Sequence, residues 1–197
     1  MKLDAWRHYL RARLFALLKR EDAAIEEYRL ALRADPGATR AAHLLAFYLA
    51  QRGQMAEAIR QLEHVVAHKP YNARAWYNLG YLRDCSREPA GAIEAFRRAV
   101  EISPKFDTAW YGLGMAQSAR HEYEPAAQAF ERVVQLEPMN GHAWYALGMT
   151  QHRLHQPDKV RSIVEHLNRF QRHHARRLIV DAERADLRHL VADLKSS

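Results

Sequence analysis

The sequence contains few of the residues that cross-link a chain or interrupt a helix. One cysteine, Cys85, cannot form an intramolecular disulfide, and no paired cysteine spacing suits a zinc site. This is typical of a reducing, cytoplasmic setting. Only 8 glycines and 7 prolines occur among 197 residues, whereas Ala, Leu, Arg and Glu are abundant. This balance favours an all-α chain over strands and turns.

Long hydrophobic runs are also missing. No segment approaches the roughly 18 consecutive apolar residues that a membrane-spanning helix needs. A short apolar run at residues 14–18 is preceded by Arg11 and Arg13 and followed by Lys19 and Arg20, and no small-residue cleavage site comes after it. We therefore interpret this run as one face of a first helix rather than as part of a signal peptide.

Residue groups that support catalysis are absent as well. Ser118, in a helical stretch, has no histidine and carboxylate partners at a recognisable spacing, and no glycine-rich phosphate-binding loop occurs. His152 and His155 lie one helical turn apart, but no cysteine or suitably spaced carboxylate completes a metal site with them. The same holds for His173 and His174. We expect no metal, no cofactor and no enzymatic activity, and we interpret these histidines as exposed on a polar helix face.

The formal net charge of +7 is concentrated at the two ends of the chain. Residues 1–40 carry +3, residues 41–140 are balanced, and residues 141–197 carry +4 together with 7 of the 12 histidines. Helical-repeat proteins with basic surfaces can bind RNA. Because the arginines lie among acids rather than in one continuous stripe, we keep binding through residues 153–188 only as an alternative and do not expect a specific nucleic-acid partner.

A repeat of 34 residues is the strongest pattern in the chain. Five columns of prolines, tryptophans, alanines, leucines and large apolar residues keep this interval. The aligned positions are Pro36, Pro70, Pro104 and Pro138; Trp76, Trp110 and Trp144; Ala24, Ala58, Ala92 and Ala126; Tyr28, Leu62, Phe96 and Phe130; and Leu45, Leu79, Leu113 and Leu147. Five columns in step indicate one structural unit repeated along the chain.

Each column suits a pair of packed antiparallel helices. Gly80 and Ala92 let the two helices approach closely, because they have little or no side chain. Trp76 and Phe96 fill the space around that contact and remove apolar surface from water. Pro104 ends the second helix, because proline lacks an N–H donor and restricts the residue before it.

The motif Trp76-x-x-Leu79-Gly80, followed by Ala92-x-x-x-Phe96 and Pro104, resembles the tetratricopeptide repeat (TPR). The tyrosine expected three residues after the glycine is absent, since Arg83 stands there. The resemblance implies a right-handed α-solenoid of about five TPR helix hairpins plus a C-terminal capping helix. We place the array at residues 1–174, in units of about 5–38, 39–72, 73–106, 107–140 and 141–174, and the capping helix and tail at residues 175–197.

The first and last units depart from the pattern, as terminal repeats usually do. His8 and Arg11 stand where tryptophan and leucine are expected, and Val160 and Val164 replace the small and aromatic residues of the last unit. Apolar residues then recur at helical spacing, which predicts a solvated capping helix on the last repeat. They are Leu178, Ala182, Ala185, Leu190, Val191 and Leu194. No comparable cap precedes the first repeat, so we expect its outer face to be open to contact, including self-association.

The resemblance also implies a binding surface. In this family the first helix of each pair lines a concave face, and the second, fifth, sixth and ninth positions of each unit lie on it or beside it. The corresponding residues are Arg40, His43, Phe47, Arg74, Tyr77, Asn78, Tyr81, Thr108, Tyr111, Met115, His142, Tyr145 and Met149. They predict an aromatic, methionine-containing groove with cationic rims, in which tyrosines one repeat apart suit peptide capture. Alternatively, these tyrosines only pack against the next repeat.

Some members of the family hold the C-terminal carboxylate of heat-shock chaperones through lysines, asparagines and an arginine at fixed columns. Only Asn78 matches those columns here, so we expect a less acidic or an internal peptide. The sequence thus predicts a non-catalytic, cytoplasmic adaptor or scaffold for complex assembly that binds a protein partner's peptide or helix in the concave groove. The alternative is a basic helical-repeat module that binds RNA or an acidic surface through its C-terminal end.

Overall fold

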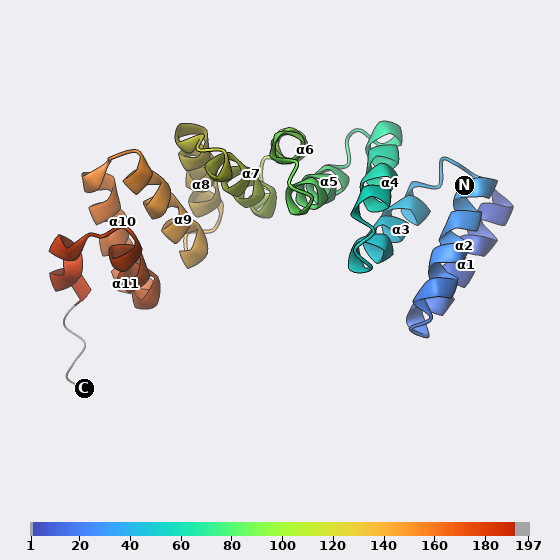
Figure 1. Ribbon diagram of the computed structural model, residues 1–197, viewed down its shortest axis with the longest axis horizontal. Coiled ribbons are helices and arrows are strands. Elements are labelled where there is room, and N and C mark those ends of the chain that lie inside the picture. Colours follow the sequence, from blue (N-terminus) through green and yellow to red (C-terminus); the bar gives the residue numbers. More distant parts are fainter. Residues whose placement is uncertain (1, 192–197) are drawn as a thin grey trace. The chain divides into compact units, whose positions relative to one another are not determined.

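The computed structural model describes residues 2–191, and all regular structure in this range is helical (Figure 1). Within it, ten α-helices form five consecutive hairpins, and an eleventh helix and a 3₁₀ helix follow. The bounds are α1 Leu3–Leu17, α2 Glu21–Ala34, α3 Thr39–Gln51, α4 Met55–His68, α5 Ala73–Cys85, α6 Pro89–Ile102, α7 Asp107–Ala119, α8 Tyr123–Leu136, α9 Gly141–Arg153, α10 Pro157–Phe170, α11 Arg172–Asp181 and η1 Ala185–Val191.

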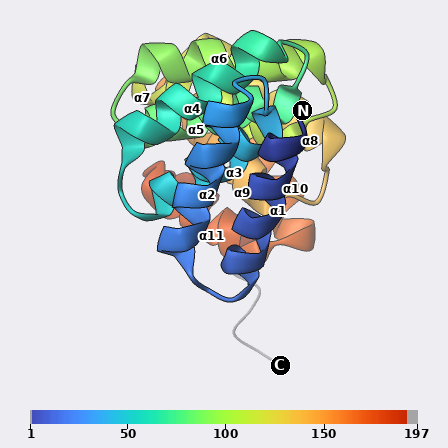
Figure 2. The same ribbon diagram turned by 90° about the vertical axis from the view of Figure 1, so that its right-hand side faces the viewer.

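The hairpins are grouped into two compact units. Unit 1, residues 1–103, contains α1 to α6, and unit 2, residues 104–197, contains α7 to α11 and η1. In unit 1, α2 packs on α3 and α4 packs on α5, so that successive hairpins stack; in unit 2, α8 packs on α9 and α10 on α11. Figure 2 shows α1 and α2 side by side in unit 1. The predicted all-α helical-repeat fold is confirmed.

The repeated prolines lie just beyond the second helix of each hairpin. α2 ends at Ala34, two residues before Pro36, and α6 ends at Ile102, two residues before Pro104. α4 and α8 end at the same distance from their prolines. The predicted role of proline as a helix terminator is therefore confirmed.

The turn inside each hairpin contains one residue with a left-handed backbone, and these residues also recur every 34 positions. They are Lys19, Gly53, Arg87, His121 and His155, with φ between 55° and 73°. Only one of them is glycine. At the other four the chain adopts a conformation that costs an ordinary residue about 1–2 kcal/mol, because the short connection between the helices requires it.

The glycines of the first helices make room for aromatic rings. A Cβ atom at Gly80 would lie 2.8 Å from the ring of Phe96, and one at Gly114 would lie 2.8 Å from the ring of Phe130. Such distances are too short for a carbon contact, so only glycine fits. The alanines at the facing column, Ala92 among them, are completely buried. The predicted close approach of the two helices is confirmed, and the aromatic ring of the second helix fills the space beside the glycine.

In the last hairpin, the space beside the glycine of the first helix is filled by a residue from outside the hairpin. Val164 stands in the column of Phe96 and Phe130, and the side chain that lies against Gly148 is Leu178 of α11. Leu178 is completely buried. α11 therefore completes the core of the fifth hairpin as well as covering it.

The C-terminal segment differs from a single helix running through residues 178–194. α11 begins already at Arg172 and ends at Asp181, because Glu183 has a left-handed backbone with φ of 53°. η1 follows, and Arg184 ties it to the start of α10 by donating to the carbonyl of Pro157 at 3.0 Å. Leu187 anchors η1 in the core. The predicted apolar position Leu194 lies outside the described residues.

The first hairpin contains a buried carboxylate at a position where the third, fourth and fifth hairpins have Ala95, Ala129 and Ile163. Glu27 is buried, and its carboxylate lies 2.7 Å from Nδ1 of His8 and 3.5 Å from Nε of Arg11. The two residues that depart from the repeat thus share one partner. The apolar run at residues 14–18 belongs to α1 and its end, but Leu14 and Leu17 are exposed rather than packed. No helix within residues 2–191 is both long and apolar enough to cross a bilayer.

Candidate partner-binding site

Unit 1 has a hollow of about 610 Å³ between α3 and α5, with Met55 and Leu62 of α4 among its lining. We call it the α3–α5 hollow. The remaining lining residues are His43, Leu44, Ala46, Phe47, Ala50, Gln51, Tyr77, Asn78, Tyr81, Leu82 and Cys85. Five of the residues predicted for the groove, at positions 43, 47, 77, 78 and 81, lie together here. Phe47 is 52% exposed and Tyr81 is 55% exposed, so both rings are open to contact.

Two polar side chains in the wall of the α3–α5 hollow, His43 and Asn78, are paired with each other. Nε2 of His43 lies 3.1 Å from Nδ2 of Asn78, which can donate to it when that ring nitrogen carries no proton. Burial lowers the pKa of His43, and the positive charge of Arg74 lowers it further. A neutral imidazole therefore lies at this wall of the hollow at neutral pH. Tyr81 faces the thiol of Cys85, and their interaction raises the pKa of the phenol.

A second hollow in unit 1, of about 500 Å³, adjoins the first at His43 and Leu44. Arg13, Arg40 and Lys69 contribute cationic groups to its lining. Arg40, which was predicted as a groove residue, lies here instead of in the α3–α5 hollow. The cations are thus placed at the edge of an apolar surface, where they can attract an acidic group of a partner.

Unit 2 has a hollow of about 400 Å³ between α7 and α9, to which the end of the α7–α8 turn and α8 also contribute. We call it the α7–α9 hollow. The predicted residues Tyr111, Met115, Tyr145 and Met149 line it. The ring of Tyr111 packs 5.6 Å from that of Phe130, and burial raises the pKa of its phenol. Tyr111 thus packs within its own hairpin and also lines the hollow, and its role in binding a partner stays a prediction.

Tyr145 differs from Tyr111 because α11 contacts it. Its hydroxyl donates to Oδ2 of Asp181 at 2.5 Å, and the guanidinium of Arg177 lies 4.7 Å from the centre of its ring. The phenol pKa is raised by burial and then by the neighbouring carboxylate. α11 therefore already covers part of the surface that this tyrosine was predicted to offer to a partner.

Three predicted groove residues, Arg74, Thr108 and His142, are not among the residues that line these hollows. Nδ1 of His142 lies 3.4 Å from Nε2 of His174 on α11. His174 is buried, so the interpretation of it as an exposed histidine was wrong. Burial lowers its pKa, and neighbouring cationic groups lower it further. Within residues 2–191 no group of three or more His, Cys, Asp or Glu side chains is arranged to hold a metal ion.

Sequence reasoning missed Gln51 and Cys85 as lining residues of the α3–α5 hollow. Each lies four residues after a predicted position, Phe47 and Tyr81 respectively, and therefore one helical turn further along the same face. Extending the predicted face by one turn would have found both. Met55 comes from the second helix of its hairpin, and only the packing of the two helices places it in the hollow.

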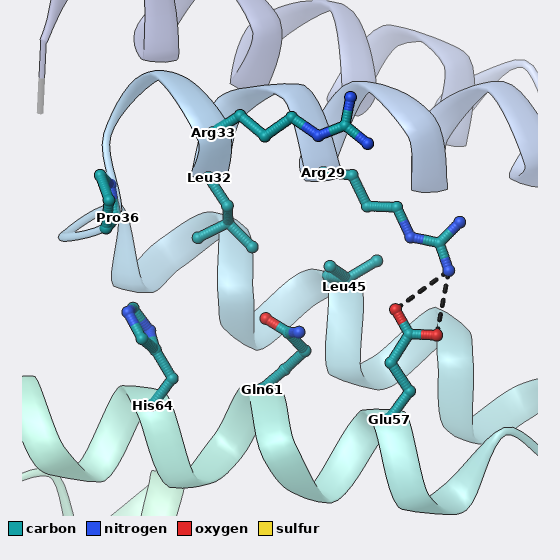
Figure 3. A pocket seen from close by; sticks show the side chains of 8 residues that line it. All are labelled: Arg29, Leu32, Arg33, Pro36, Leu45, Glu57, Gln61 and His64. Carbon is teal, nitrogen blue, oxygen red and sulfur yellow. Dashed lines mark hydrogen bonds and ion pairs between the residues drawn. The ribbon is translucent and has the colours of Figure 1, made fainter.

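A smaller hollow of about 320 Å³ lies between α2 and α4, with Leu45 of α3 between them (Figure 3). Both Oε atoms of Glu57 accept hydrogen bonds of 3.0 Å from Arg29, which joins the first hairpin to the second. Figure 3 shows this pair at one end of the hollow and His64 and Pro36 at the other. Because Arg29 and Glu57 are already paired across it, this hollow is better suited to joining the hairpins than to binding a partner.

Residues 7–39, 43–107 and 111–173 match the family model described as a tetratricopeptide repeat. The chain belongs to the tetratricopeptide repeat family. Its five TPR hairpins thus correspond to the α1–α2, α3–α4, α5–α6, α7–α8 and α9–α10 pairs.

Solved structures of other TPR proteins resemble this one. YrrB, described as a TPR protein with an unusual peptide-binding site, is 22% identical, with a TM-score of 0.80 over 92% of each chain. A MamA protein is 22% identical, with a TM-score of 0.77 over 95% of this chain and 98% of its own. PilF of Pseudomonas aeruginosa is 21% identical, with a TM-score of 0.70 over 90% of this chain and 82% of its own. At these identities the likeness concerns the fold. None of the curated proteins matches the chain.

Proposed function

We propose that this TPR chain is a non-catalytic adaptor or scaffold that binds an extended or helical segment of a protein partner, with the α3–α5 hollow as its principal contact. The observation that carries the proposal is the composition of this hollow. Its volume of about 610 Å³ falls within the range of about 300–1,000 Å³ that is typical of ligand sites. A TPR array presents such surfaces on rigid helices, which suits the recognition of a peptide.

The lining indicates what kind of peptide segment fits. Phe47 and Tyr81 provide flat, partly exposed rings, and Met55 provides an adaptable apolar floor. The His43 and Asn78 pair offers one polar contact for orientation. We therefore expect a partner segment that places one or two large apolar side chains in the hollow. An acidic residue beside them would face the cations of the adjoining hollow.

The comparison with YrrB supports the same class of function. That protein is described as having an unusual peptide-binding site on a TPR fold. Peptide binding by this chain is a proposal that rests on the lining of its own hollow. The α7–α9 hollow, with Tyr111, Met115 and Met149, is proposed as a second contact of the same chemical kind.

The test begins with a library of random displayed peptides selected on the purified chain. Enriched peptides are then synthesised, and their dissociation constants are measured for the wild type and for the double variant Phe47→Ala with Tyr81→Ala. Both rings are partly exposed, so the double variant should keep its fold. We expect an increase in the dissociation constant of at least about tenfold, since truncating interface aromatics commonly costs more than 1–2 kcal/mol.

Tyr71→Ala is the matched control, because Tyr71 is 88% exposed in the turn before α5 and is absent from the hollow lining. It should leave the dissociation constant unchanged. The proposal is wrong if no peptide is enriched, or if the selected peptides bind the double variant as tightly as the wild type.

One observation favours a second candidate function. Arg172, His173 and Arg176 are exposed on α11, which makes this helix the basic surface for the alternative of RNA or acidic-surface binding. Such binding would be electrostatic and would weaken steeply with salt. Filter binding of a random-sequence RNA, repeated for Arg172→Gln with Arg176→Gln, tests it. Absence of retention near physiological salt would exclude this function.

A further inference from the structure

One face of α1 is apolar and exposed. Six of the thirteen large hydrophobic residues exposed within residues 2–191 lie between positions 3 and 18. Five of them, Leu3, Trp6, Leu10, Leu14 and Leu17, recur at intervals of three and four residues. At 3.6 residues per turn they fall within an arc of about 80° on the helix. We call this set the α1 stripe.

The α1 stripe is distinct from the face by which α1 joins the fold. Ala5, Tyr9 and Ala12 are the buried residues of α1, and they lie on the side that packs against α2. The most exposed members of the stripe are Leu17, at 80%, and Leu3, at 73%. α1 is thus apolar on two sides, of which only one packs within unit 1.

Positive charges flank the α1 stripe on both sides. By the helical repeat, Arg13 lies on one edge of the arc, and Arg7 and Arg11 lie on the other. Lys19 and Arg20, both exposed, follow at the end of the helix next to exposed Leu18. Residues 2–20 carry six lysines and arginines and one acid, Asp4.

We infer that the α1 stripe docks on the surface of an anionic lipid bilayer. Leucines and a tryptophan on one side of a helix, with lysines and arginines at its edges, form the pattern by which helices lie in the membrane interface. The long arginine side chains can bury their methylene groups beside the stripe and extend their charge to the phosphates. Trp6 is stacked on Tyr9 with ring centres 5.4 Å apart, which orients its indole, and tryptophan is a residue type that favours the membrane interface.

Two other occupants fit less well. In a second copy packed stripe to stripe, Arg7, Arg11 and Arg13 of both chains would approach one another, and this repulsion opposes association. A partner helix would need a groove to bury its own apolar face, whereas the hollow beside the stripe on α1 is lined by the polar residues Asp4, Arg7, His8 and Arg11. A ridge with cations on both edges matches a flat anionic surface better.

Vesicle sedimentation tests the inference. The full chain is mixed with vesicles of phosphatidylcholine alone or with added phosphatidylglycerol, at low and at high salt. We expect sedimentation only with the anionic vesicles, and less of it at high salt. Leu10→Gln with Leu14→Gln should reduce the partition coefficient at least about tenfold through the loss of inserted hydrocarbon. Arg7→Gln with Arg13→Gln should reduce it about 25-fold, since each cation near the surface contributes about fivefold.

Tyr71→Gln is the control, because it removes an aromatic ring of unit 1 that lies outside α1 and is even more exposed than Leu10 and Leu14, and it should bind as the wild type does. Equal sedimentation with neutral vesicles, or none with anionic ones, would overturn the inference. Sedimentation velocity on the same variants tests whether a second copy of the chain binds the α1 stripe instead. Self-association that the leucine substitutions abolish, in the absence of vesicle binding, would assign the stripe to a second copy. Peptide binding by the α3–α5 hollow is measured without lipid, so the two proposals can fail independently.

Discussion

The indole nitrogen of Trp76 donates a hydrogen bond of 2.8 Å to the carbonyl oxygen of Pro70, six residues earlier. The same bond joins Trp110 to Pro104 at 3.0 Å and Trp144 to Pro138 at 2.8 Å. Two columns of the 34-residue repeat are therefore linked directly. Proline ends one hairpin, and its carbonyl is held by the tryptophan of the next helix, which fixes the direction in which the chain enters the following hairpin.

Trp76→Phe should lower the free energy of unfolding by about 1 kcal/mol, because it removes this hydrogen bond while keeping most of the ring. Urea unfolding followed by circular dichroism measures the change. Trp6→Phe is the control, since Trp6 lies on the exposed face of α1, and it should have little effect. Equal effects of the two substitutions would show that the bond to the proline carbonyl contributes nothing.

Arg87→Gly should stabilise the protein by about 0.5–1 kcal/mol, because glycine adopts the left-handed backbone of this turn without strain. Gly53→Ala, at the equivalent position one repeat earlier, should destabilise it by about 1 kcal/mol for the same reason. Arg87 is exposed, and nothing lies within 4 Å of a Cβ atom at Gly53. Opposite shifts of the urea midpoint are therefore expected, and shifts of the same sign would contradict the explanation.

The fold could be predicted from the sequence because five columns of large, small and helix-ending residues repeat at a constant interval. The repeated turn residues with a left-handed backbone could not be predicted, because Gly53 is the one glycine among the five, and glycine is the residue type that signals such a backbone. Nor could the packing of Leu178 against Gly148, in the place that phenylalanine fills in the hairpins before it, since it depends on how α11 packs on α9.

Part of the predicted groove lies together in one hollow, and its role in binding a partner stays a prediction. Positions 43, 47, 77, 78 and 81 share a hollow because the helical period places them on one face. Tyr145 belongs to the column of positions 43 and 77, and His142 belongs to the column of Arg40 and Arg74, but α11 contacts both of them. The place of a residue in the repeat does not reveal the contacts that a terminal helix makes. Groove positions predicted from the repeat are therefore least accurate in the last hairpin.

Acid should destabilise unit 1 through His43. Its pKa is lowered in the folded protein by burial and then by Arg74, so the unfolded chain binds this proton more readily. The free energy of unfolding should therefore decrease as the pH falls below about 6.5, the ordinary histidine value. Protonation also gives Nε2 a hydrogen where Asn78 donates. Urea unfolding at pH 7.5 and pH 5.5 should show a smaller loss for His43→Gln than for the wild type.

His64 and His174 also have pKa values lowered by burial. The His43→Gln variant should therefore keep part of the acid sensitivity. An unchanged difference between the two pH values would assign the effect to those histidines instead of His43.

The fifth hairpin offers a test of the packing rule that governs the others. Leu178→Ala should destabilise unit 2 by about 2–5 kcal/mol, because it leaves a cavity against Gly148. Val164→Phe alone should also destabilise it, because the new ring would compete with Leu178 for the same space. Combined, the two substitutions recreate the glycine and phenylalanine pair of Gly114 and Phe130, so the double variant should be more stable than either single one. Urea unfolding of all four proteins measures the coupling, and simple additivity would mean that Val164 does not occupy the position of the phenylalanine column.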